Sequence, residues 1–257
     1  MIDIIMDEHL MDLKEVRIWN IKLNLLTVDE IVAIVTQWVD EGKRNIHLTG
    51  VSADVAALAQ NNELLREAIL SSDIVNVDSF IPTYLLKRKG YPIKERVPCP
   101  DIMEGFFRYA NEKKKKVYFL GAKATTLELL VPIIKKDYPN LIIVGTQDGY
   151  YTEAEEESIA DRISSVSPDF LFIAMPTPKK ELFIKTYKNR INVGVFYGIG
   201  GAFEARTGEV KRPPHFLRGN GLEGILRVLK RPRVYAKRLP MLYRFYKYAI
   251  HDNGEGK

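Results

Sequence analysis

Residues 193–201 read Val-Gly-Val-Phe-Tyr-Gly-Ile-Gly-Gly, an apolar run that ends in a glycine-rich turn. A short apolar run bounded by turn residues is typical of a strand buried on both faces. Segments with a helical spacing of apolar residues separate this run from five others of the same character. The alternation predicts an α/β fold, Rossmann-like, with a mostly parallel sheet flanked by helices. The five other predicted strands are residues 46–49, 74–77, 117–120, 141–144 and 170–173.

Three helix starts carry recognisable end signals. Thr27 with Glu30 and Thr152 with Glu155 have the spacing of a capping box, in which each side chain accepts a hydrogen bond from a free amide. Thr177 followed by Pro178 has the form of an N-cap residue and a proline at the first helical position.

The positive charge of the chain is concentrated near its C-terminus. The 257 residues carry a net charge of +5, but residues 211–248 alone contain eleven Lys or Arg and one acid, Glu223. Such a block implies an anionic partner, either nucleic acid or a membrane surface. Leucines and tyrosines alternate with these charges, which suits an amphipathic helix at a bilayer interface. We therefore expect a catalytic domain over residues 1–207 and a membrane-docking segment over residues 208–257, and we expect a chain ending near Thr207 to fold.

Several classes of protein are excluded by composition. The longest uncharged apolar runs fall far below the ~20 residues of a membrane-spanning helix. Acidic residues in the first fifteen positions do not fit a signal peptide, so we expect a cytoplasmic protein. A single cysteine, Cys99, excludes an internal disulfide and a multi-cysteine zinc site, and Cys99 is expected to be a packed residue. No metal site is expected.

Polar residues gather where predicted strands end, which is where open parallel sheets bind ligands. Asp78 follows a buried strand and is either a general base or a helix N-cap. Lys179 and Lys180 occupy a first helical turn, where cations are disfavoured unless an anion lies nearby; the alternative is two surface lysines balanced by Glu181. Thr49 and Ser52 follow another strand.

Two further segments suit phosphate binding. The turn from Gly198 to Gly201 allows close approach of the backbone to a phosphate, or serves only as a tight turn. It lacks the third glycine of a dinucleotide fingerprint, which disfavours a nucleotide-sugar oxidoreductase. Arg96, in a loop with two prolines, has the planar fork that binds pyrophosphate, or forms a surface ion pair.

Taken together, these segments resemble the WecG/TagA/CpsF glycosyltransferases, glycosyltransferase family 26, over roughly residues 16–244. The stretches that carry the resemblance are residues 53–59, 73–78, 95–97 with Asp101, 118–122, 144–151, 178–181, 197–203 and 208–212.

The resemblance implies an inverting, metal-independent transferase without a cofactor. It implies transfer of N-acetylmannosamine or a related hexose from a UDP-sugar to an undecaprenyl-pyrophosphate-linked sugar, in the synthesis of teichoic acid, capsule or related polymers. The enzyme would lie on the inner face of the plasma membrane, and its oligomeric state stays open. Asp78 matches the catalytic base and Arg96 a catalytic arginine. Residues expected to contact substrate are Thr49, Ser52, Asp101, Lys180, Glu181, Arg212 and Arg218. Residues expected to contact the nucleotide are Gly121, Tyr151, Pro178, Lys179, Gly198, Gly200, Gly201 and Phe203.

The chain also departs from the family pattern around the expected sugar site, which leaves the donor sugar open. Gly50 and Ser52 stand where many members have threonine and asparagine, and Lys180 replaces a glutamine. Ser79 replaces a glycine, and Cys99 with Pro100 replaces Gly-x before Asp101. The alternative function from another class is nucleic-acid binding through the basic C-terminus.

Overall fold

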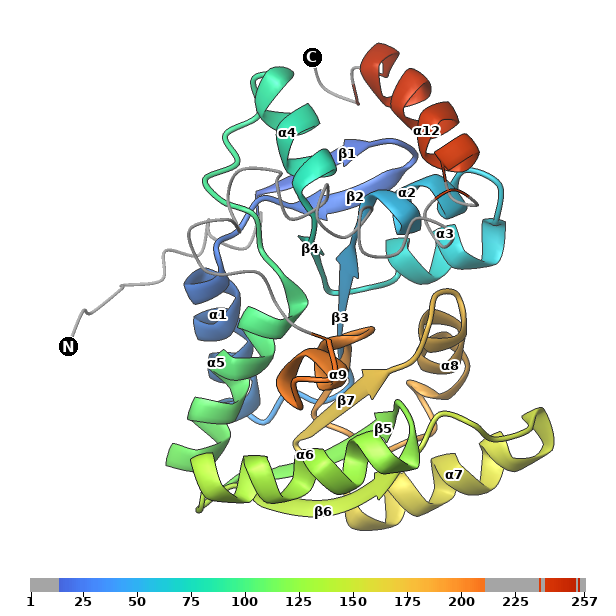
Figure 1. Ribbon diagram of the computed structural model, residues 1–257. Coiled ribbons are helices and arrows are strands. Elements are labelled where there is room, and N and C mark those ends of the chain that lie inside the picture. The colour runs from blue at the N-terminus through green and yellow to red at the C-terminus, as the bar shows by residue number, and fades with distance from the viewer. Residues whose placement is uncertain (1–13, 211–235, 237–238, 253, 255–257) are drawn as a thin grey trace.

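A six-stranded parallel sheet forms the centre of the molecule (Figure 1). The computed structural model describes residues 14–210, 236, 239–252 and 254. The strands lie in the order β4-β3-β8-β7-β5-β6, and each neighbouring pair is parallel. All six strands predicted from apolar runs are confirmed. Their bounds are β3 (Ile46–Val51), β4 (Ile74–Val77), β5 (Lys116–Gly121), β6 (Ile142–Gln147), β7 (Phe170–Ala174) and β8 (Val195–Gly198).

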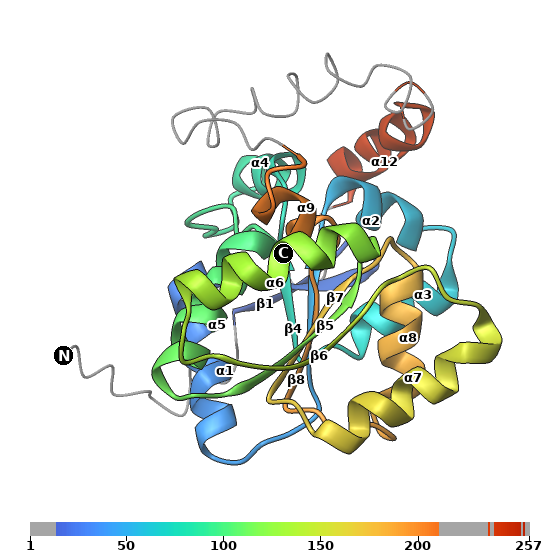
Figure 2. The same cartoon turned by 60° about the horizontal axis from the view of Figure 1, so that its bottom comes forward.

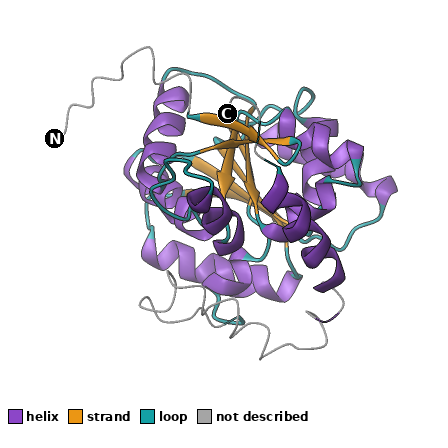
Figure 3. Ribbon diagram, turned by 90° about the horizontal axis from the view of Figure 1, so that it is seen from above, coloured by secondary structure: helices purple, strands orange, loops and turns teal. Residues whose placement is uncertain are grey.

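Helices cover both faces of this sheet, as Figures 1 and 3 show. Side chains of α1, α5, α6 and α9 share one buried cluster with the sheet, whereas α7 and α8 share another. The prediction of two buried faces is wrong for β6, because it is an edge strand with half-exposed side chains. The helices are α1 (Val28–Asp40), α2 (Ala53–Ala59), α3 (Glu63–Leu70), α4 (Phe80–Arg88), α5 (Cys99–Glu112), α6 (Ala124–Asp137), α7 (Glu153–Val166), α8 (Lys179–Tyr187), α9 (Ala202–Arg206) and α12 (Leu239–His251).

Two of the three expected helix starts are confirmed. Thr27 and Glu30 form the capping box of α1, and Thr152 and Glu155 form that of α7. The third is wrong in detail, since Pro178 is the N-cap of α8 and not its first helical residue. The Thr177 hydroxyl instead donates to Glu181 Oε1 within the first turn.

A hairpin and the last helix pack beyond β4, an edge strand of the sheet. The antiparallel pair β1 (Glu15–Ile18) and β2 (Ile21–Asn24) was not predicted. Its turn residues, Trp19 and Asn20, both have positive φ, as a type I′ hairpin turn requires. Trp19 is fully buried and packs edge to face against Phe245 of α12, with the two ring centroids 5.4 Å apart.

The last helix therefore belongs to the packed structure. Phe245 and Ala249 are buried with residues of α2, α3 and the hairpin, and Asp252 accepts the Trp19 amide at 2.6 Å. Figure 2 shows α12 at the same end of the molecule as α4. The division at residue 207 stays a prediction. In the part of the chain that the structure describes, no helix is long and apolar enough to cross a bilayer.

Candidate functional site

A cavity of about 490 Å³ lies at the carboxyl ends of β3, β4, β7 and β8. Parallel strands bring their carboxyl ends to one edge of the sheet, so residues far apart in sequence meet there. Six of the predicted site residues line this cavity, and they come from four strand ends. They are Ser52, Asp78, Lys180, Gly198, Gly200 and Gly201.

Asp78 is fixed by the backbone of another element. Its own amide donates to the carbonyl of Val51, which continues the pairing of β4 with β3. Its Oδ1 accepts the amide of Cys99, the first residue of α5, at 2.8 Å. The N-cap of α4 is Ser79, so the alternative of Asp78 as the cap of that helix is wrong. Among the described residues no hydrogen bond reaches Oδ2 of this half-buried carboxylate, and Asp78 lines the cavity.

Cys99 and Gly50 share one small volume in the cavity wall. A Cβ atom at position 50 would lie 2.2 Å from the Cys99 sulfur, so glycine is required while cysteine occupies position 99. Burial, and then the nearby Asp78 carboxylate, raise the pKa of the Cys99 thiol. The expectation of a packed cysteine is confirmed, since Cys99 is buried. The two positions at which the chain is expected to depart from the family pattern therefore occupy adjoining volume.

Lys180 brings a positive charge to the cavity. Its ammonium donates to the Thr177 hydroxyl and to Glu181 Oε1. The side chains of Lys180 and Glu181 are 6% and 0% exposed, so neither is the surface residue of the alternative interpretation. Glu181 Oε2 is buried and accepts no hydrogen bond from the described residues. A buried charge pair with an unsatisfied oxygen is costly, and such pairs are often found where a ligand completes them.

The glycine turn passes directly beside this lysine. A Cβ at position 198 would lie 3.1 Å from Lys180 Cδ, so Gly198 leaves room for the lysine stem along the cavity wall. Gly200 has a φ of +55°, and a Cβ atom at this position would have no other atom within 4 Å. The Ile199 amide is already bonded to the Ile173 carbonyl, whereas glycine at positions 200 and 201 allows a ligand to approach the rest of the turn closely.

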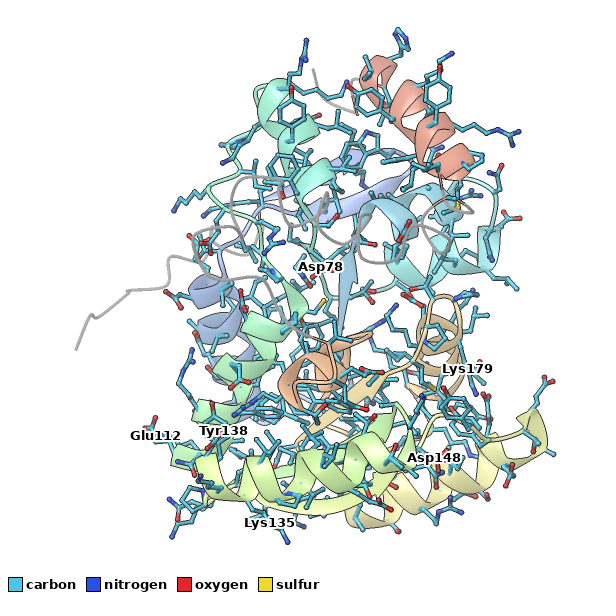
Figure 4. The ribbon with its side chains drawn as sticks, in the orientation of Figure 1. Asp78, Glu112, Lys135, Tyr138, Asp148 and Lys179 are labelled. Carbon is cyan, nitrogen blue, oxygen red and sulfur yellow. The ribbon has the colours of Figure 1, made fainter. Side chains whose placement is uncertain are left out.

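A second group of predicted residues lies beside the cavity, around the ends of β5 and β7. Lys179 Nζ lies 3.7 Å from the centre of the Tyr151 ring and donates to the Gly149 carbonyl. Figure 4 shows Lys179 on the side of Asp148 and away from Asp78. The Tyr151 hydroxyl donates to the sulfur of Met175, which lines the cavity and so connects the two groups.

Gly121 and Pro178 occupy turns next to this second group, and their contact with a nucleotide stays a prediction. Gly121 has a φ of +107°, and a Cβ there would lie 2.3 Å from the Ala174 carbonyl oxygen. Pro178 precedes the first turn of α8 and is not in the cavity wall.

Other predicted residues lie outside the cavity wall. The Thr49 hydroxyl forms a hydrogen bond with the ring of buried His47. Phe203 packs against Phe119 in the core, with the ring centroids 5.3 Å apart. Arg96 is half-buried in the loop before α5. The amide of the next residue, Val97, donates to the carbonyl of Val77. Asp101 lies in the first turn of α5. Arg212 and Arg218 lie outside the described residues.

Asp54 and Met241 are among the cavity residues that sequence reasoning missed. Asp54, in the first turn of α2, follows the N-cap Ser52 and adds a second carboxylate to the wall. Met241 comes from α12, and its only signal was the helical spacing of apolar residues in that segment. Within the described ranges, no three His, Cys, Asp or Glu side chains are grouped to hold a metal ion.

Comparison with known proteins agrees with this arrangement. The model of the glycosyl transferase WecG/TagA/CpsF family matches residues 16–254. The chain is similar to an N-acetylglucosaminyldiphosphoundecaprenol N-acetyl-beta-D-mannosaminyltransferase of Bacillus spizizenii, with 29% identity over 79% of this chain and 78% of the relative. Enzymes of the same name from Bacillus subtilis and Staphylococcus aureus share 28% and 25% identity, over 72% and 80% of both chains.

The match spans the sheet, the cavity and α12, and so covers every element that positions the site. The relatives carry a hexosyltransferase name, and nothing in them favours nucleic-acid binding. The chain therefore belongs to the WecG/TagA/CpsF family and is a glycosyltransferase.

Proposed function

We propose that this enzyme transfers N-acetylmannosamine or a related hexose from a UDP-sugar to an undecaprenyl-pyrophosphate-linked sugar. The observation that carries the proposal is the Asp78 carboxylate, held by the Cys99 amide at the cavity where four strand ends meet. The names of the three relatives specify a mannosaminyl group and a diphosphoundecaprenol acceptor, which supports both substrate classes.

The proposed reaction is a single displacement. Asp78 Oδ2 takes the proton of the acceptor hydroxyl as its oxygen attacks the anomeric carbon of the donor. The bond from that carbon to the β-phosphate oxygen breaks, and UDP leaves with the electron pair. One displacement inverts the anomeric centre.

Positive groups in the cavity would stabilise the leaving UDP. The Lys180 ammonium lines the cavity, and the Gly198–Gly201 turn lies beside it. Charge that develops on a phosphate is stabilised most by donors already fixed in place. Thr177 and Glu181 fix the lysine in this way.

A metal is not part of the proposal, since these groups would replace it at the pyrophosphate. The enzyme would work at the inner face of the plasma membrane, because a prenyl-linked acceptor stays in the bilayer. The residues exchanged relative to the family, Lys180 and the pair Gly50 and Cys99, line the cavity and would select the donor sugar.

The test is a screen of UDP-sugars for release of UDP with synthetic lipid-pyrophosphate acceptors that carry N-acetylglucosamine. We expect release that requires both donor and acceptor, and a product with an inverted anomeric centre by NMR. A screen in which no donor gives acceptor-dependent release of UDP would overturn the proposal.

A further inference from the structure

The strongest unassigned feature is the outer face of α4, together with α12. Among the described residues, fourteen large apolar side chains are exposed, and three of them lie on α4 and five on α12. Those on α4 are Phe80, Ile81 and Tyr84, between 38% and 43% exposed. Monomeric proteins scatter such side chains, so a concentration on two helices indicates an interaction surface.

The exposed face of α4 is apolar at its start and basic at its end. Phe80, Ile81 and Tyr84 are followed by Lys87 and Arg88, all on the side opposite the buried Leu85 and Leu86. The rings of Phe80 and Tyr84 stack at 6.0 Å, and Arg88 donates to the Tyr84 hydroxyl. This combination of aromatic rings and cations suits the boundary between headgroups and acyl chains.

The C-terminal end of α4 lies beside the C-terminal end of α12. Lys89 donates to the carbonyl of Ile250 at 2.8 Å, which joins the ends of the two helices. Both lie at the same end of the molecule in Figures 1 and 2. Tyr243, Arg244 and Lys247 extend the same pattern along α12.

The charge of this surface favours an anionic partner. Neither α4 nor α12 contains an acidic residue, whereas each of the other helices in the described part of the chain contains at least one. Two longer segments of the same chain lie outside the described residues. Residues 211–235 carry seven Lys or Arg and one Glu, so like charges disfavour that segment as the occupant, whereas residues 1–13 carry four acidic residues and are too short to cover both helices. An anionic, partly apolar surface complements the face, and an anionic bilayer has both properties.

We infer that α4 is a membrane-docking element, and that it forms with α12 one face, called here the docking face (Phe80, Ile81, Tyr84, Lys87, Arg88, Tyr243, Arg244 and Lys247), which binds anionic bilayers. This inference deepens the proposed function and rests on it for its purpose. Asp78 lies two residues before α4, and Met241 of α12 lines the cavity. A bilayer on the docking face would therefore present lipid pyrophosphates beside the catalytic carboxylate.

The experiment is sedimentation of the full-length protein with vesicles of phosphatidylglycerol and phosphatidylcholine, and with phosphatidylcholine alone. The first variant, Lys87→Gln with Arg88→Gln, changes exposed side chains and leaves the core intact. We expect its binding to the anionic vesicles to fall roughly tenfold or more, since each surface cation contributes substantially to such binding. The matched control is Lys135→Gln with Lys136→Gln, because these lysines are also an exposed basic pair in the last turn of a helix, α6. The control should bind as the wild type does.

A second variant tests the apolar half of the face. Phe80→Ser, Ile81→Ser and Tyr84→Ser should also weaken binding, whereas Leu64→Ser, Leu129→Ser and Ile142→Ser, at other exposed positions, should not. Wild-type binding by both α4 variants, or equal losses in the controls, would overturn the inference. A change of oligomeric state without a change of vesicle binding would identify a protein interface and also overturn it. Sedimentation needs no sugar substrate, so its outcome is separate from that of the UDP-release screen.

Discussion

At the scale of single residues, Asp78 has a structural role and a proposed catalytic role, and one substitution can separate them. Its Oδ1 accepts a hydrogen bond from the first amide of α5, and in the proposed reaction its Oδ2 takes the proton of the acceptor hydroxyl. Asp78→Asn keeps the oxygen that accepts the Cys99 amide and removes the base. We expect turnover to fall about 10²–10⁴-fold, the usual contribution of a general base, while UDP binding and the melting temperature change little.

The matched control is Asp73→Asn at the opposite end of the same strand. Asp73 also accepts a backbone amide, that of His47 at 2.8 Å, but it lies away from the cavity. Its substitution should lower stability and leave turnover near normal. Near-normal turnover of Asp78→Asn would assign Asp78 to the capping of α5 alone.

A second residue-scale prediction concerns the shared volume of Gly50 and Cys99. Gly50→Thr places a Cβ 2.2 Å from the cysteine sulfur, which should lower the free energy of unfolding by about 1–3 kcal/mol. Adding Cys99→Gly removes the clash and should restore much of that loss. Urea denaturation of both single variants and the double variant measures the coupling. Additive effects would show that the two positions are independent.

At the scale of elements, β3 carries a pH-dependent contribution to stability. Burial, and then the charge of Lys188, lower the pKa of His47 from 6.5 to about 3. The histidine is therefore neutral in the folded protein, where it bonds to Thr49 and Ser72, and takes a proton below pH 6.5 only when the chain unfolds. Stability should thus fall as the pH drops from 6.5 towards 3, by about 1 kcal/mol between pH 7 and pH 5.5.

Urea denaturation at the two pH values checks this prediction. In His47→Gln, which keeps a polar side chain between the same partners, the loss on going from pH 7 to pH 5.5 should shrink by about 1 kcal/mol. An unchanged loss in that variant would show that other groups control the acid sensitivity.

The elements differ in how well the sequence predicts them. The six strands and two capping boxes depend on residues within a few positions of each other, and all were predicted. The hairpin was missed because its four-residue strands are short and its turn contains Trp19, an unusual residue at positive φ. The available signal was the alternation of polar and apolar residues on either side of Asn20.

The candidate site was predictable only in part, for a related reason. Parallel strands place their ends together, so the meeting of Asp78, Ser52 and the glycine turn follows from strand order. The bond from Cys99 to Asp78 joins residues 21 positions apart through a loop, which no local pattern encodes. For the same reason the sequence did not separate Lys180 in the cavity from Lys179 beside it.

At the scale of the whole molecule, catalysis is expected to need no divalent ion. The cavity combines the Lys180 ammonium with the amides of the glycine turn, and these would hold the pyrophosphate. Turnover should survive EDTA when UDP release is measured with excess donor and acceptor. Complete loss in EDTA that Mg²⁺ or Mn²⁺ restores would show that a metal takes part.

The last prediction concerns the C-terminal region, whose charge suggests a removable appendage and whose packing suggests part of the folded core. The basic residues predict an appendage that can be removed at Thr207, but Phe245 and Ala249 of α12, spaced one helical turn apart, are buried beside Trp19. Truncation at Thr207 would expose that tryptophan and remove the carboxylate that accepts its amide. Loss of a buried Phe side chain alone costs about 3–5 kcal/mol, so we expect the shortened chain to be less stable by at least that amount.

Fluorescence can follow this loss at Trp19 itself. The chain has two tryptophans, so Trp38→Phe leaves Trp19 as the sole reporter in both the full-length and the truncated protein. The truncated chain should show a red-shifted emission and a lower melting temperature. If emission and melting temperature stay unchanged, residues 1–207 form an independent domain and α12 is only an attachment. If they change as expected, loss of vesicle binding in the truncated chain is no evidence for docking, and the full-length α4 variants become the valid test of that surface.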